Sequence, residues 1–381
     1  MLHVEGHSAS FPVEILIQIL LSADKRDLPS LCRVNATFRR YGSDLLYHDI
    51  STRNPLAVCH TISLSPDLAQ RVRSFEISRN ANATVTLIKY SYALISDALR
   101  CMTRLRALRL HVEGSYAWIL RSCTAPLEKF LFSGHADADL VHFLSCQNEL
   151  REITLTSPNS GYHVDGACLA KLHTISAPPS WLRQLIAGRP VTTVGCLYGP
   201  AWSSFLVATL SDFEFLTLSS LPIRKLDIGF LHANLHSALM SRISDILPGI
   251  EELTLKNCDD IAGSLDNAER MDSSTVTRRV RHLILALPTL RCIAIDGRVN
   301  HLAWSNEAAM LYVEGMSKGA VSLEKFSIVI YGARCLHRHV QPCTASKVFR
   351  LVDGRWTCIR AQARASCAPC TQAMTREHIY A

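Results

Sequence analysis

The segment LRALRL at residues 105–110 contains the pattern that decides the fold: an apolar residue, two others, an apolar residue, one other and a final apolar residue. Leu108 and Leu110 are two residues apart, which places both side chains on the same face of a short strand. Clear copies of the pattern also begin at Leu127, Leu150, Ile223, Ile250, Leu290 and Leu323. Weaker copies begin at Val72, Leu169 and Val191. A pattern repeated this often predicts a repeat architecture.

Helical periodicity precedes several of these copies. Before the copy at Leu105, apolar residues recur at helical spacing at Leu94, Ile95, Ala98, Leu99 and Met102. Similar runs in residues 239–247 and 280–287 precede the copies at Ile250 and Leu290. The predicted unit is therefore a helix followed by a strand. Because neither element buries its apolar side alone, we expect stacked units in a curved, right-handed α/β solenoid, with strands on one side and helices on the other.

This body resembles a leucine-rich repeat array. The spacings from residue 105 to 127 to 150 fall within the 20 to 29 residues of such repeats, and the array is expected to cover residues 71–332. It is irregular, because later spacings stretch to 27, 40 and 33 residues and an Asn or Cys closes the strand turn in good register only at Asn257-Cys258. Two strand patterns overlap in residues 213–228, which remain unassigned. The alternative is an ordinary α/β domain with a parallel sheet.

Residues 11–21, FPVEILIQILL, predict a short helix with Pro12 in its first turn. Glu14, Gln18 and Ser22 recur every four residues and form one thin polar stripe, and the other positions are apolar. A helix that is apolar on nearly all sides is normally buried on two sides. Since the surrounding segment is short, we expect another protein to cover one of those sides. Two more short helices are expected around residues 28–34 and 38–46.

This N-terminal segment resembles the F-box, over residues 9–50. The resemblance rests, in order and spacing, on FPVEIL at 11–16, Ile19-Leu20, Asp27-Leu28, Leu31, Val34, Phe38-Arg39 and Leu45-Leu46-Tyr47. Phe11 replaces the usual leucine, and Asn35 stands where a small residue or cysteine is common. In that family the first helices dock onto a Skp-type adaptor, which carries the receptor to a cullin. The resemblance implies adaptor contacts at Phe11, Pro12, Ile15, Leu16, Ile19, Leu20, Leu28, Leu31 and Val34. An ordinary three-helix subdomain is the alternative.

Composition narrows the class of protein. Hydrophobic residues make up 48% and charged residues 19% of the 381 residues, which is too apolar for a disordered chain. No apolar run approaches the roughly 20 residues of a bilayer span, and the N-terminus lacks the pattern of a secretory signal. We therefore expect a cytoplasmic or nuclear protein with no membrane partner. The fourteen cysteines are scattered, which favours reduced thiols in the core over disulfides.

Residues 51–70 are expected to be a linker and residues 333–381 a poorly ordered basic tail. The tail has eight basic and two acidic residues, so it supplies +6 of the net charge of +7. It contains one CxxC, Cys367-Ala368-Pro369-Cys370, near His337-Arg338-His339. Structural zinc usually needs two such pairs, so we expect no metal, with a zinc knuckle as the alternative. Few aromatic residues lie between the arginines, so a nucleic acid is not an expected partner.

Motifs of catalysis are missing from the sequence. None of GxGxxG, GxxxxGK[ST], GxSxG or HExxH occurs, and acidic pairs such as Asp137 with Asp139 or Asp259 with Asp260 are typical of turns and helix caps. We expect no cofactor and no enzymatic activity. The leading hypothesis is the substrate-recognition subunit of a Skp–cullin–F-box ubiquitin ligase, which docks the adaptor through the F-box and an unidentified target protein through the repeats. The alternatives are an adaptor-bound scaffold outside a ligase and an α/β enzyme with an N-terminal helical cap.

Exposed positions beside the strand pattern are the expected places for target-selective mutations. These positions are Arg106, Arg109, Lys129, Arg151, Glu152, Glu251, Lys256 and Arg291. In a repeat array such positions accumulate into one broad surface, on which a few aromatic or arginine residues dominate the binding energy. The sequence alone does not predict which of the eight contact the target.

Overall fold

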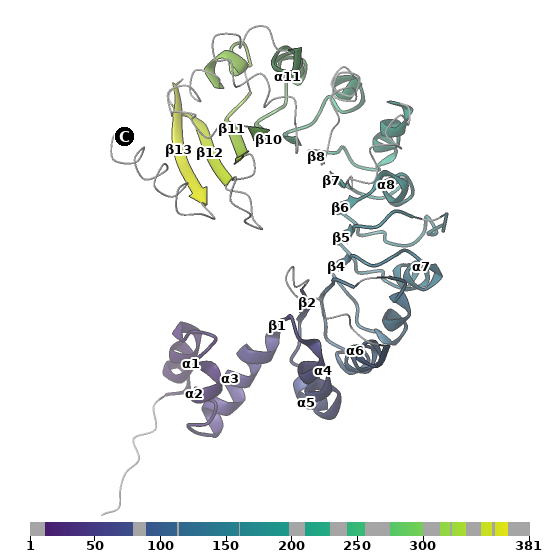
Figure 1. The fold of residues 1–381 in the computed structure, drawn as a ribbon, viewed down its shortest axis with the longest axis vertical. Helices are drawn as coiled ribbons and strands as arrows, with labels where there is room; N and C mark the ends of the chain where they lie inside the picture. The colour runs from purple at the N-terminus through teal and green to yellow at the C-terminus, as the bar shows by residue number, and fades with distance from the viewer. Residues whose placement is uncertain are drawn as a thin grey trace, which may run out of the picture. The chain divides into compact units, whose positions relative to one another are not determined.

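The computed structural model has a mixed α/β fold (Figure 1). It describes residues 12–78, 89–112, 114–159, 161–197, 210–228, 242–255, 275–299, 313–320, 322–332, 344–352 and 355–364. The chain divides into two compact units, Met1–Leu169 and Ala170–Ala381. The first unit begins with a helical bundle and continues into parallel strands, and the second unit consists of further strands with their helices.

Three short helices begin the first unit, as the sequence predicts. They are α1 (Val13–Ser22), α2 (Leu28–Leu31) and α3 (Ala36–His48). Asn35 is the N-cap of α3, and its side-chain Oδ1 accepts a hydrogen bond from the backbone N–H of Phe38 at 2.8 Å. This bond satisfies one of the four N–H groups that a helix N-terminus leaves without a partner.

The three helices enclose a small core. Leu20, Leu28 and Phe38 are buried at its centre. Partly buried side chains pack around them, namely Leu16, Ala23, Leu31, Tyr41, Leu45 and Leu46. Gly42 lets α3 approach the segment after α2 closely, because a Cβ at this position would lie 2.6 Å from the sulfur of Cys32. The bundle therefore has little room for larger side chains on this face of α3.

The prediction of a linker at residues 51–70 is wrong. Helix α3 leads directly into strand β1 (Asp49–Thr52), and helices α4 (Pro55–Leu64) and α5 (Pro66–Ala69) follow. The side chains that these two helices bury include Cys59, Ile62 and Ala69. The segment is therefore part of the folded body, with its apolar residues in the core.

Strands β1 to β5 of the first unit are parallel and adjacent in sequence order where their pairing is described. The others are β2 (Ser74–Ile77), β3 (Ala107–Leu110), β4 (Lys129–Phe132) and β5 (Glu152–Leu155). Helical segments between them are α6 (Lys89–Cys101), the 3₁₀ helix η1 (Ala117–Ser122) and α7 (Ala138–Ser145). Figure 1 shows α6 and α7 on one side of the strands. Leu108 and Leu110 are buried and Arg109 is exposed, as a strand with one covered face requires.

The second unit repeats this arrangement. Its parallel strands are β6 (Thr174–Ala177), β7 (Thr193–Cys196), β8 (Lys225–Ile228), β9 (Glu252–Leu255), β10 (Cys292–Val299) and β11 (Lys325–Gly332). Each pairs with the next in register. Between them lie α8 (Pro179–Ile186), the 3₁₀ helix η3 (Leu210–Leu218), α11 (Thr275–Ala286) and helical turns at 242–246 and 313–317. The helix-then-strand unit is confirmed here.

Two details of the repeat pattern differ from the prediction. The weak copy expected at Leu169 begins three residues later, because Leu172, Ile175 and Ala177 supply the buried side chains of β6. Leu169 is itself buried but has a positive φ of 62°, which is incompatible with a strand. In residues 213–228 the two overlapping patterns are resolved into the end of η3 and strand β8.

The described part of the predicted basic tail is folded. Strands β12 (Thr344–Val352) and β13 (Arg355–Arg364) pair with each other in antiparallel fashion, and β12 pairs with β11. Phe349 and Trp356 are buried, which gives this segment a core that the basic composition concealed. The expectation of poor order is therefore wrong for these strands. The CxxC at 367–370, the cluster at 337–339 and the turn at 257–258 lie outside the described residues.

Candidate functional site

Helix α1 presents an exposed apolar stripe. Pro12 is exposed, and Ile15 and Ile19 keep 46% and 43% of their surface accessible. Ile15 and Ile19 are four residues apart, which places both side chains on one face of a helix with 3.6 residues per turn, and Pro12 directly precedes this helix as its N-cap. Exposed apolar side chains that lie together on one helix face are suited to contact with another protein.

The other predicted adaptor contacts have different surroundings. Leu20 and Leu28 are buried in the bundle core, and Leu16 and Leu31 are half-buried against it. In this arrangement Leu20 and Leu28 offer no surface to a partner, and they stabilise the bundle instead. Val34 remains 64% exposed after α2. Phe11 lies outside the described residues.

A hollow between α3 and α5 was not expected from the sequence. It has a volume of about 580 Å³ and combines the apolar residues Leu64, Pro66 and Leu68 with basic residues on its rim. The rim arginines are Arg39, Arg40 and Arg71, and Arg71 forms an ion pair with Asp44. Leu64 is 69% exposed, so it belongs to the surface of the protein and not to its core. Because residues 51–70 are expected from the sequence to be a linker, the end of α4 and the beginning of α5 are not predicted to form this hollow.

Charged residues stand at the beginning of β2 to β5 in the first unit and of β8 to β11 in the second. The first row, as we name it, is the residue directly before each strand, and the second row is the first residue of each strand. Opposite charges meet on neighbouring strands in both rows. The pairs are Arg106–Glu128 at 2.7 Å, Lys129–Glu152 at 2.8 Å, Arg224–Glu251 at 3.6 Å, Lys225–Glu252 at 2.5 Å and Arg291–Glu324 at 2.9 Å. In each pair the basic residue comes from one strand and the acidic residue from the next.

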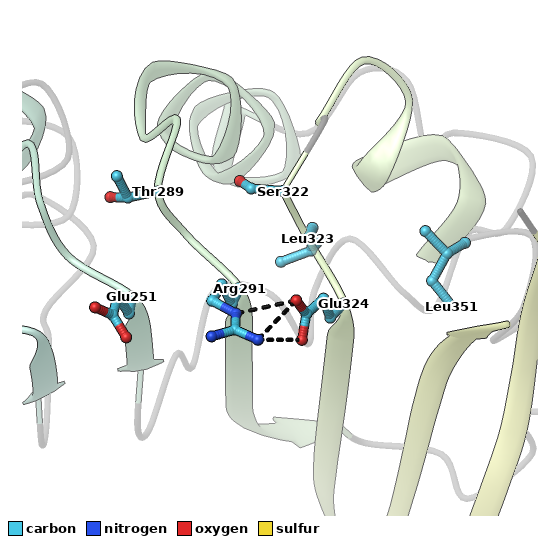
Figure 2. Close-up of a pocket in the computed structure, with 7 residues that line it drawn as sticks. All are labelled: Glu251, Thr289, Arg291, Ser322, Leu323, Glu324 and Leu351. Atoms are coloured by element: carbon cyan, nitrogen blue, oxygen red, sulfur yellow. Dashed lines mark hydrogen bonds and ion pairs between the residues drawn. The ribbon is translucent and has the colours of Figure 1, made fainter.

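A hollow of about 440 Å³ lies at the beginning of β9 to β11. Figure 2 shows the residues that line it. Arg291 lies between two carboxylates there, and its Nε and Nη2 donate to Glu324 at 3.0 and 3.1 Å. This hydrogen bond and the charge of Glu324 raise the pKa of Arg291. Ser322 donates to the carbonyl oxygen of Leu290 at 3.0 Å, so its hydroxyl has a structural role. These groups hold neighbouring strands together, and the apolar side chains of Leu323 and Leu351 complete the lining of this open hollow.

The predicted target-contact positions are mostly engaged in such pairs. Arg106, Lys129, Glu152, Glu251 and Arg291 take part in the pairs of the two rows. Arg109 pairs with Glu76 at 3.5 Å on the exposed face of β2 and β3. Arg151 is exposed, and Lys256 lies outside the described residues. The sequence identified these side chains as exposed, but it gave no strand register from which to predict the pairing.

The described cysteines are thiols that form no disulfide bond. Burial raises the pKa of Cys59 to about 12 and that of Cys123 to about 11. Burial also raises the pKa of Cys196 to about 12, with the charge of Asp227 adding to the shift. These three thiols are neutral core residues at physiological pH and are poor nucleophiles, as expected for cysteines in an apolar core.

Within the part of the chain that the structure describes, no three His, Cys, Asp or Glu side chains gather in a group that could hold a metal ion. No described helix combines the length and apolar character needed to cross a membrane. No protein-family model matches the sequence, and no curated protein matches it either.

Proposed function

We propose that this protein is a substrate receptor of a Skp–cullin–F-box ubiquitin ligase. Residues 12–48 are the adaptor-binding module, and the strand repeats hold a target protein. The ubiquitin-transfer chemistry belongs to other subunits in this proposal, and this chain supplies binding surfaces only.

The observation that carries the proposal is the exposed apolar pair Ile15 and Ile19 on α1, with the exposed Pro12 at the N-cap of that helix. The bundle core is formed by Leu20, Leu28, Phe38 and their neighbours, so the accessible surface of Pro12, Ile15 and Ile19 is left uncovered by it. Complete burial of a fully exposed side chain of this size is worth roughly 1.5 to 3 kcal/mol, and Ile15 and Ile19 keep 46% and 43% of their surface accessible, so covering them gives a partner about half of that value for each. The three helices also occur in the order and spacing on which the F-box resemblance rests.

The repeats support the second half of the proposal. Exposed or half-buried side chains alternate with buried ones along β3, β4 and β5, so these consecutive strands build one continuous surface. The hollows along the strand beginnings are lined by charged and polar side chains. Such a surface suits the broad contact of a protein target.

The adaptor contact is tested by co-purification of the full-length chain with a Skp-type adaptor. The variant with Ile15→Asp and Ile19→Asp places two charges in the proposed contact, where each unpaired buried charge costs several kcal/mol. We expect adaptor recovery to fall at least tenfold. Both positions are exposed, so the folded state tolerates the change, and circular dichroism of the variant should match the native protein.

Leu21→Asp is the matched control. Leu21 is 58% exposed on the same helix, but it lies 200° around the axis from Ile19 at 100° per residue, so it belongs to a different face. We expect it to retain the adaptor. Equal loss with Leu21→Asp, or no adaptor with the native chain, would contradict the proposal. If the adaptor and a cullin bind but no bound protein receives ubiquitin in a reconstituted reaction, the protein is instead a scaffold.

A further inference from the structure

At the neighbouring strands β2 and β3, the first row brings two positive charges together. Arg73 and Arg106 occupy equivalent positions directly before β2 and β3. The two strands are adjacent there, because the backbone N–H groups of Arg106 and Ala107 donate to the carbonyl oxygen of Arg73 at 2.8 and 2.9 Å. At the first-row pairs of Arg106, Arg224 and Arg291, a carboxylate on the next strand stands opposite the arginine.

A third arginine, Arg104, lines the same hollow as Arg73 and Arg106. Arg73, Arg104 and Arg106 line a hollow of about 460 Å³, together with Glu128 and Glu149. Arg104 is exposed on the turn between α6 and β3, and no ion pair with a carboxylate of the described chain holds it. Three guanidinium groups therefore share one concave surface with two carboxylates.

The three guanidinium groups differ in how far their charge is compensated. Arg106 is neutralised by Glu128, at 2.7 Å. Arg73 donates from Nη1 to the carbonyl oxygens of Gln70 and Val72 at 2.7 and 3.3 Å, and carbonyl oxygens orient a guanidinium without cancelling its charge. The pKa of Arg73 is lowered, first by partial burial and then by the charges of Arg104 and Arg106, with Asp44 opposing the shift. Positive charge therefore remains at Arg73 and Arg104.

We propose that this hollow binds a carboxylate side chain of an acidic segment of a partner protein, between Arg73 and Arg104. Guanidinium groups bind carboxylates through paired, charge-assisted hydrogen bonds, and Arg73 is already oriented by two carbonyl oxygens. The lining carries a formal charge of +1, which one carboxylate cancels. A phosphoryl dianion would exceed that charge beside Glu128 and Glu149. The site goes beyond the proposed function and does not depend on it.

The test uses the purified full-length chain at low ionic strength with a hexaglutamate peptide as the probe. Isothermal titration should detect hexaglutamate binding, and a hexaglutamine peptide should give no signal. Arg104→Gln removes one guanidinium group and should weaken hexaglutamate binding at least tenfold. Arg121→Gln is the charge-matched control, because Arg121 lies in η1 and pairs with Asp139 at 2.6 Å. We expect that variant to bind within twofold of the native chain.

A second measurement needs no ligand. Since Arg104 repels Arg73, Arg104→Gln should raise the midpoint of thermal unfolding at low salt, and the difference should vanish near 1 M salt, where the Debye length is about 3 Å. A lowered midpoint would contradict the like-charge cluster. Equal loss of binding in Arg121→Gln, absence of hexaglutamate binding, or tighter Arg104-dependent binding of inorganic phosphate would each overturn the proposed carboxylate site.

Discussion

The helical bundle and the strand pattern of the repeats differ in how far their apolar side chains are buried. Among the described residues of the bundle, five large apolar side chains are exposed, namely Val13, Ile15, Ile19, Leu21 and Val34. In the strand pattern from Leu105 to Leu155, every apolar position keeps at most 2% of its surface accessible. In this stretch the strand pattern therefore buries its apolar residues, whereas the bundle leaves several of its apolar residues exposed.

The difference follows from how each part is built. A short helix that is apolar on nearly all sides has more apolar surface than the two neighbouring helices of the bundle, α2 and α3, can cover. A strand in a stacked array has the next strand on each side and a helix on one face, so each repeat buries the apolar residues of its neighbour. Apolar residues thus form the core of the body in one region and a surface suited to a partner in the other.

Substitution of a core residue of the repeats is expected to have the largest effect. Phe75→Ala removes a fully buried ring from β2 and should lower the free energy of unfolding by about 3 to 5 kcal/mol. Ile19→Ala, in the bundle, removes an exposed side chain and should change it by less than about 0.5 kcal/mol. Urea unfolding of the two variants measures both values. Equal effects would show that the contrast between the two regions is wrong.

Much of the fold could be predicted from apolar spacing alone. A strand lies where each strong copy of the pattern predicts one, because two buried residues at positions two apart define a covered strand face. Strand β1 was missed because Ile50 and the polar Thr52 give only half of the pattern. The strands β12 and β13 were missed because antiparallel pairing needs no helix between strands, so neither carries the helix-then-strand signal.

The candidate site was predictable only in part. Apolar excess on α1 could be seen in the sequence, but the choice between Ile19, which is exposed, and Leu20, which is buried, depends on the angle at which the three helices pack. The charge pairs of the two rows depend on strand register, which joins residues more than twenty positions apart. Arg73 and Arg104 carry no sequence signal of their own, because only the adjacency of β2 and β3 brings their charges together.

Helix caps provide an intermediate effect in both regions. Asn35 caps α3 of the bundle, and Asp137 caps α7 of the repeats by accepting from the backbone N–H of Leu140 at 3.0 Å. Asn35→Ala and Asp137→Ala should each lower the stability of their helix by about 1 kcal/mol. Hydrogen exchange of α3 and α7 measures the two effects separately. Asp27→Ala is the control, because the Asp27 side chain makes no capping bond to α2.

The two cap variants also sharpen the comparison. The bundle has few buried residues, so loss of the capping hydrogen bond in Asn35→Ala should speed hydrogen exchange across all of α3. The loss at Asp137 should remain near the first turn of α7, because buried Leu140, Phe143 and Leu144 hold the rest of that helix against its neighbours. Equal spread of exchange through both helices would contradict this difference in local stability.

The smallest expected effect lies in the exposed charge pairs. Lys129 and Glu152 are about half exposed, at 50% and 46% of their side-chain surface, so water screens the pair and its contribution is roughly 0.2 to 1 kcal/mol. The residue beside Lys129 on β3 is the uncharged Ala107, so the pair can be reversed without creating a like-charge contact there. Lys129→Glu and Glu152→Lys should each destabilise the protein slightly, and the double variant should recover native stability. A double-mutant cycle in urea measures the coupling energy between Lys129 and Glu152, and its repetition at about 1 M salt should remove that coupling. A coupling energy well above 1 kcal/mol would mean that charge pairing, and not apolar burial, sets the register of the repeats.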